Sequence, residues 1–169
     1  IWALGNNSVP DNNHNSLYGS ISNNLNIRSY VNASNELSGP DFNMEQGIEF
    51  EKVENARMLS NNEYTFNSVL GFISLNQSLN NDEVLSVAYQ YTYGGETYQV
   101  GELSTDGVSG QNALYLKLLK STVRNPQKKL WDLMMKNVYS LGAYQVDATN
   151  FRLDIWYNNP STSIDINYI

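Results

Sequence analysis

The chain has 169 residues, a length that suits one domain with a sizeable core. Its formal net charge is -7 at pH 7, so its field repels phosphate backbones and anionic lipid, and nucleic acid is excluded as an expected partner. Cysteine is absent, which excludes disulfides, a thiol nucleophile and a cysteine-based metal site.

The remaining composition favours short strands joined by tight turns. Charged residues make up only 16% of the chain, twelve residues are tyrosine, and Asn clusters such as "SNNLN" and "LNNDEV" recur. Asn favours turns because it tolerates left-handed backbone geometry and hydrogen-bonds its own neighbours. No apolar run is long enough to cross a bilayer as a helix, so we expect no direct transmembrane span. We therefore predict a single β-rich domain over residues 1–169.

The first half of the chain begins without a regular pattern and then turns strand-like. Residues 1–41 contain Pro10, Pro40 and dense Asn and Ser, and we predict an irregular entry segment. From Gly47 the run "GIEFEKV" alternates apolar and acidic residues, which predicts a bulged strand with one wet, acidic face. Strands are expected next at 63–66 and 71–75.

The most regular pattern is a hairpin between residues 85 and 100. Gly94 and Gly95 supply a turn that requires positive φ, and Tyr98 and Val100 return on the second strand. One face of the first strand is expected to carry Leu85, Val87, Tyr89, Tyr91 and Tyr93. Residues 112–120 fit a strand or a short helix, and their brevity favours a strand.

One amphipathic helix is predicted at about 126–141. Asn125 can cap it, Pro126 suits its first position, and Gly142 is the expected stop. Its apolar stripe consists of Leu130, Trp131, Met134, Val138 and Leu141. Further alternation at 151–157 and from 162 onward predicts more strands. The expected fold class for 47–169 is mainly β, an antiparallel sandwich-like domain with this helix packed on the sheet.

Residues that could perform chemistry are sparse. The lone histidine, His14, lies in a polar turn-rich stretch, where a loop role is expected. Glu49 and Glu51 share a predicted strand face, but a glycosidase pair usually joins carboxylates from different strands, so we favour a solvated face. There is no phosphate-binding glycine motif. We expect no catalytic residues and no cofactor.

Two Asn- and Asp-rich stretches contain oxygen ligands that calcium could use. They are Asp11, Asn12, Asn13 and Asn15 in the first, and Asp82 and Glu83 in the second. Neither has the spacing of a calcium-binding loop, so no metal site is predicted.

The aromatic residues leave two interpretations open. Sugar stacking or a protein interface could use Tyr89, Tyr91, Tyr93 and Tyr98, with Trp2, Trp131 and Trp156. The same row fits an aromatic sheet core whose hydroxyls reach the rim, and this second interpretation is favoured.

Two long runs carry a family likeness. The segment Ala56–Glu102, with "LGFISLNQSL" and "YQVGE", and the segment Leu114–Asn159, with "WDLMMKNVYSLGAYQV", resemble the SprA (Sov) family of gliding-motility proteins of the Bacteroidota. The resemblance implies a segment of a much larger chain, part of the outer-membrane β-barrel translocon of the type IX secretion system. It implies protein transport rather than catalysis, and no family site residues carry over.

The expected role is thus a non-catalytic structural or interaction module of that translocon. The polar loops predict a water-exposed module in the cell envelope, associated with the outer membrane on its periplasmic or cell-surface face. Its expected partners are other parts of the same large protein, accessory secretion-system subunits or secreted cargo. The alternative is a carbohydrate-binding or adhesive surface domain that uses the aromatic row, and a glycoside hydrolase fragment ranks far below both.

Overall fold

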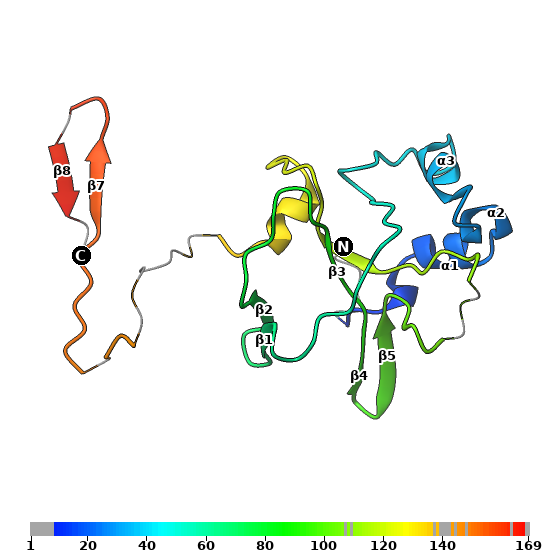
Figure 1. Cartoon of the computed structure of the whole chain (residues 1–169), viewed down its shortest axis with the longest axis horizontal. Coiled ribbons are helices and arrows are strands. Elements are labelled where there is room, and N and C mark those ends of the chain that lie inside the picture. The colour runs from blue at the N-terminus through cyan, green and yellow to red at the C-terminus, as the bar shows by residue number, and fades with distance from the viewer. Residues whose placement is uncertain are drawn as a thin grey trace. The chain divides into compact units, whose positions relative to one another are not determined.

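The computed structural model describes residues 9–106, 108, 110–136, 138, 143, 145–147, 149–162 and 164–167. The chain divides into two compact units, Ile1–Met135 and Lys136–Ile169. Among the described residues, the larger unit contains all the helices and strands β1 to β6, and the smaller unit contains β7 and β8 (Figure 1). The single domain expected over residues 1–169 stays a prediction.

Four short helices follow one another near the start of the larger unit. They are the 3₁₀ helix η1 (Asn12–His14) and the α-helices α1 (Ser16–Ser22), α2 (Leu25–Arg28) and α3 (Ala33–Ser38). The prediction of an irregular segment over 1–41 is therefore wrong for residues 12–38. Two of its asparagines, Asn15 and Asn24, cap helices instead of forming strand turns. Asn15 Oδ1 accepts from Leu17 N at 3.0 Å, and Asn24 Oδ1 accepts from Asn26 N at 2.9 Å.

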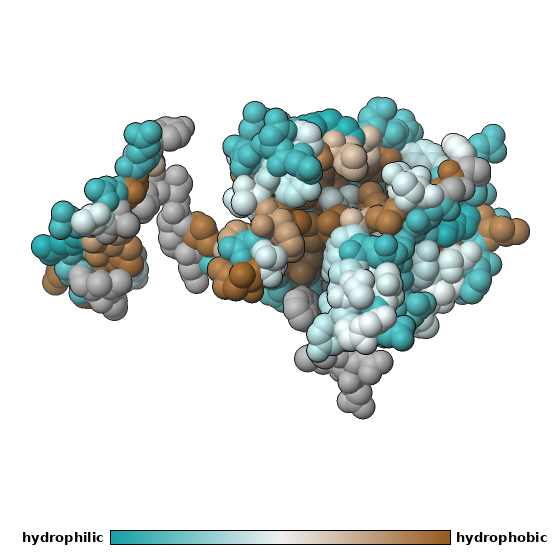
Figure 2. Space-filling model, turned by 90° about the horizontal axis from the view of Figure 1, so that it is seen from below, coloured by the Kyte–Doolittle hydropathy of each residue, from teal (hydrophilic) through white to brown (hydrophobic). Residues whose placement is uncertain are grey.

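The buried apolar cluster lies in this helical region. Its centre is Ile21 of α1, Ile27 of α2 and Leu37 of α3. Partly buried side chains packed against it are Leu17, Phe42, Met44, Phe50 and Tyr115. Figure 2 shows apolar residues gathered in the middle of the larger unit, with polar residues around them. Helices of four to seven residues are too short to show a hydrophobic period, which is why the sequence pattern did not reveal them.

The first hairpin lies close to its predicted position. Strands β1 (Tyr64–Asn67) and β2 (Phe72–Leu75) pair antiparallel, with Tyr64 opposite Leu75. Asn67 shapes the turn, because its Oδ1 accepts from Leu70 N at 2.9 Å, and Gly71 closes it at φ 68°.

The predicted hairpin at 85–100 forms two separate pairings. Strand β4 (Tyr89–Tyr93) pairs with β5 (Glu96–Val100) around Gly94 and Gly95, whose φ values of 62° and 87° confirm the predicted turn. Strand β3 (Leu85–Val87) pairs instead with β6 (Lys117–Lys120), which confirms a strand at the end of 112–120. The chain therefore changes partner at Ala88.

Gly101 lies against Ala88, where the chain changes its strand partner. We predict that a methyl group added to Gly101 lowers the stability of the fold. Gly101 has φ 73°, and a Cβ on it would lie 3.1 Å from Ala88 Cβ. We expect Gly101→Ala to lower the free energy of unfolding by at least about 1–2 kcal/mol in urea titrations.

The matched control is Gly19→Ala in the middle of α1. A Cβ on Gly19 meets no described atom within 4 Å, so this change should stabilise the chain by about 0.5–1 kcal/mol. Equal unfolding midpoints for the two variants would show that the Gly101 conformation is not needed.

The predicted helix at about 126–141 is much shorter than expected. Only the 3₁₀ helix η2 (Lys129–Leu133) forms, and Met134 after it is extended at ψ 141°. Val138, within the predicted range, is 64% exposed. Positions 137 and 139–141 of the predicted range lie outside the described residues.

The predicted strand at 47–53 is also absent. Residues 47–49 form a turn, bounded by an isolated bridge between Gln46 and Phe50. Gly47 N donates to Phe50 O at 2.8 Å, and Gly47 takes φ 85°. The alternation of apolar and acidic residues in this run therefore belongs to a turn and not to a strand.

The smaller unit contains one hairpin. Strand β7 (Trp156–Asn159) pairs antiparallel with β8 (Ile164–Asn167), which confirms a strand in the alternating tail. The strand predicted at 151–157 begins only at Trp156.

The mainly β class with antiparallel pairing is confirmed. Within the described chain the strands pair as four two-stranded sheets, and the helices are short. None of the described helices has both the length and the apolar character that crossing a membrane requires.

Candidate functional site

A polar hollow runs along the outer edge of β5. It encloses about 410 Å³ and draws its walls from the η1 segment, α1 and the β4–β5 hairpin. Its lining residues are Asp11, Asn12, Asn13, Tyr18, Gln90, Glu96, Thr97, Tyr98 and Gln99. We call this hollow the β5 groove. It is large enough for a small ligand or an extended peptide segment.

The η1 segment covers one end of the β5 edge through side chains. Asp11 Oδ1 accepts from Gln99 N at 3.2 Å. The Asn12 amide pairs with both backbone groups of Gly101, accepting from its N at 2.8 Å and donating to its O at 3.0 Å. These side chains occupy backbone groups that a neighbouring strand would otherwise use.

These contacts account for the first of the two oxygen-rich stretches. Asp11 Oδ2 accepts from Asn13 N at 3.2 Å, and Asn15 Oδ1 caps α1. The oxygens therefore serve backbone N–H groups. Across the described residues, no group of three or more His, Cys, Asp or Glu side chains is placed to hold a metal ion.

In the second stretch a lysine occupies the place that a cation would take. Lys120 Nζ donates to Asn80 O at 3.0 Å and to Asn81 O at 3.2 Å, and it also contacts Glu83 O. The Glu83 carboxylate accepts from Asn80 N at 2.7 Å. The carbonyls around Asp82 thus face an ammonium group.

The tyrosine row lies on one face of the β4–β5 hairpin and is only partly covered. Tyr91 and Tyr98 stand opposite each other with ring centroids 5.5 Å apart, and Tyr91 Oη donates to Pro10 O at 2.6 Å. Tyr89 and Tyr93 are exposed. The favoured interpretation, an aromatic sheet core, is therefore wrong for the two outer tyrosines. Trp2 lies outside the described residues.

A buried ion pair ties the helices to the strands. The Glu102 side chain is almost fully buried and accepts from Arg28 Nη1 at 2.8 Å, from Tyr115 N at 2.9 Å and from Tyr18 Oη at 3.0 Å. A second contact joins Arg28 Nη2 to Glu102 Oε1. Arg28 also stacks over the Tyr115 ring, 5.6 Å from its centroid. Hydrogen bonds join the side chains of Glu102, Arg28 and Tyr18, and Tyr115 joins them through its backbone N–H and through its ring.

The ionised Glu102 carboxylate of this cluster has a structural role. Burial acts to raise the pKa of Glu102, but hydrogen bonds from Arg28, from the Tyr115 backbone and from Tyr18 hold it below the ordinary glutamate value. Burial raises the pKa of Tyr115 to about 12 and also raises that of Tyr18. A carboxylate with so many donors is stabilised as an anion and is a poor general base near neutral pH.

The other sequence candidates each contact a different partner. Glu49 accepts from Glu45 N at 3.0 Å and pairs with Lys128 at 3.5 Å. Glu51 accepts from Thr122 N at 2.8 Å. His14 closes η1, where its N donates to Asp11 O at 3.1 Å. Each residue therefore supports a turn or a contact between segments.

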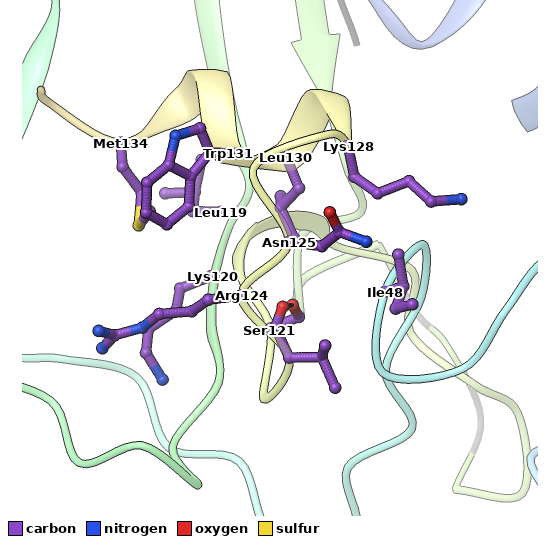
Figure 3. Close-up of a pocket in the computed structure, with 11 residues that line it drawn as sticks. Ile48, Leu119, Lys120, Ser121, Arg124, Asn125, Lys128, Leu130, Trp131 and Met134 are labelled. Carbon is purple, nitrogen blue, oxygen red and sulfur yellow. Dashed lines mark hydrogen bonds between the residues drawn. The ribbon is translucent and has the colours of Figure 1, made fainter.

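A second, apolar hollow lies beneath η2 and encloses only about 20 Å³ (Figure 3). Leu130 and Trp131 of η2 and Met134 just after it line this hollow, together with Leu119 of β6. A volume of that size has room for about one water molecule, so this hollow is a packing contact and not a ligand site.

The comparisons with known proteins give no identity. No family model matches the sequence, and no curated protein matches it.

Proposed function

We propose that this chain is a non-catalytic interaction module of a SprA-like outer-membrane translocon, used in type IX protein secretion and gliding motility. In this proposal it lies in the cell envelope, on the periplasmic or the cell-surface face of the outer membrane. It contacts other parts of the same large protein, accessory subunits or cargo.

The observation that carries the interaction role is the exposure of large apolar side chains on the β1–β2 hairpin. Val69 is 90% exposed and Leu70 is 73% exposed, side by side in its turn. Phe66 in β1 is also exposed. Adjacent apolar side chains of this size on a hairpin tip are typical of a surface that another protein covers.

The chemistry of the described residues supports a role without catalysis. The carboxylates of Glu51, Glu63 and Glu102 each accept hydrogen bonds from defined donors, and these contacts hold loops or helices. The link to the translocon rests on the resemblance of residues 56–102 and 114–159 to the SprA family.

The proposal is tested by a single charge placed on the hairpin tip of the full-length parent protein. We expect Val69→Asp to reduce secretion of type IX cargo at unchanged outer-membrane abundance, because the charge opposes burial of the tip in a protein contact. The measurement is cargo in the medium, with the abundance of the parent protein determined in parallel.

Ser68→Asp is the matched control, since Ser68 is an exposed polar neighbour in the same turn. It should leave secretion unchanged. Normal secretion with Val69→Asp, and again after deletion of residues 1–169 at normal abundance, would refute the transport role and favour an adhesive surface domain.

A further inference from the structure

The β4–β5 hairpin has two edges, and its geometry shows which backbone groups point outward. Tyr93 and Glu96 flank the two-residue turn, so they form the hydrogen-bonded pair that closes it. Hydrogen-bonded and non-hydrogen-bonded pairs alternate along an antiparallel ladder. Thr92 and Thr97 are the next pair, so their backbone N–H and C=O groups point away from the hairpin on opposite edges.

The contact between Asp11 and Gln99 agrees with this assignment. Gln99 lies two residues beyond Thr97 and donates its N–H outward to Asp11 at 3.2 Å. In the described part of the chain, no corresponding hydrogen bond reaches the backbone of Thr97 from outside the hairpin. The η1 segment therefore stops covering the β5 edge just before Thr97.

The β5 groove lies at this uncovered position. Thr97 and Glu96 line it together with the side chain of Gln90 from the neighbouring strand. An exposed strand edge beside a groove is the arrangement in which an extended peptide can add as a further strand.

The charge of the groove selects among peptides. Two carboxylates, Asp11 and Glu96, line it, and its nine lining residues include no lysine or arginine. The whole chain has a net charge of -7. An acidic segment would be repelled, while a basic one would be attracted.

We infer that the β5 groove binds an extended, basic segment of a partner protein, whose backbone pairs with the outward N–H and C=O groups of Thr97. Pairing with an added strand needs both backbone groups of Thr97, and both point outward. Asp11 already occupies the next outward N–H along this edge, that of Gln99. The inference names a partner chemistry for the interaction module and rests on that proposed function.

The probe is a synthetic peptide of alternating threonine and valine with a lysine at each end. A second peptide with glutamate at each end tests the charge preference. We expect the lysine peptide to shift the Thr97 and Glu96 amide signals of the full chain in NMR titrations. At low salt it should bind roughly fivefold or more tightly than the glutamate peptide.

The decisive variants exploit the Thr92–Thr97 pair, because proline at either position removes an outward N–H. Thr97→Pro should weaken binding of the lysine peptide about tenfold, while Thr92→Pro should leave it unchanged. Equal effects of the two variants would overturn the assignment to the β5 edge.

Glu96→Lys keeps the test decisive if proline disturbs the hairpin. Glu96 is exposed, and its reversal of charge should shift the preference toward the glutamate peptide. An unchanged preference would overturn the inference.

A neutral oligosaccharide that shifts the Gln90 and Gln99 side-chain signals, with no response to either peptide, would show a sugar site instead. Failure of peptide binding leaves the secretion result on Val69→Asp intact, so the two proposals fail separately.

Discussion

Replacement of Glu102 by glutamine should lower the free energy of unfolding by about 3–5 kcal/mol, the usual cost of removing one partner of a buried ion pair. The Glu102 side chain is only 3% exposed and that of Arg28 19%, so little water can replace the lost carboxylate. Glutamine preserves volume and removes charge. Chemical denaturation followed by circular dichroism measures the change.

Glu63→Gln is the matched control. Glu63 pairs with Arg57 at 2.7 Å, but the Arg57 side chain is 68% exposed. Solvent screens such a pair, so its loss should change the unfolding midpoint very little. Equal losses for Glu63→Gln and Glu102→Gln would show that burial of the Glu102 pair does not set its strength.

Acid provides a second readout of the same pair. The folded-state pKa of Glu102 lies below its ordinary value of 4.5. A group with a depressed pKa contributes stability that is present above the unfolded-state pKa and is lost as the pH falls through the folded-state pKa. The wild-type chain should therefore lose stability below about pH 4.5, and Glu102→Gln should lose less over the same interval. Parallel pH profiles would contradict this role.

Trp131→Ala should have the second largest effect, a loss of about 2–3 kcal/mol. The Trp131 ring lies against Leu119 of β6 and Met134 in the hollow beneath η2 (Figure 3). Its partial burial places the cost below the range for fully buried aromatic residues. The measurement is the urea midpoint at constant slope, which separates a stability change from a change in the unfolded chain.

Trp156→Ala provides the comparison, because Trp156 in β7 is 62% exposed. This substitution should change stability by less than about 0.5 kcal/mol. A neutral Trp131→Ala would mean that η2 contributes nothing to the larger unit and that the Trp131 side chain serves a partner instead.

The sequence predicted the hairpins because their signals are local. Gly94 and Gly95 require positive φ, and the flanking residues alternate with period two, so turn and register follow from adjacent positions. The same reasoning failed at residues 12–38. Asn15 and Asn24 suit turns and helix caps equally well, and only the packing of Ile27 distinguishes the two.

Long-range contacts could not be predicted. Arg28 and Glu102 lie 74 residues apart, and nothing near either residue marks the other as its partner. The β5 groove likewise depends on a contact between Asp11 and Gln99, which lie 88 residues apart in the sequence. The apolar stripe predicted a helix at 126–141, and η2 does form around Trp131 within that range. Periodicity alone does not show how far along the chain such a helix continues.

The Lys120 ammonium within the loop at residues 80–83 acts as a tethered cation. A free metal ion at these carbonyls would be lost on dilution or to a chelator, whereas a covalently attached charge has a fixed, high effective concentration. The loop therefore needs no free metal ion to bridge these carbonyls. Acetylation of Lys120 would release it, because the amide retains only one donor and no charge.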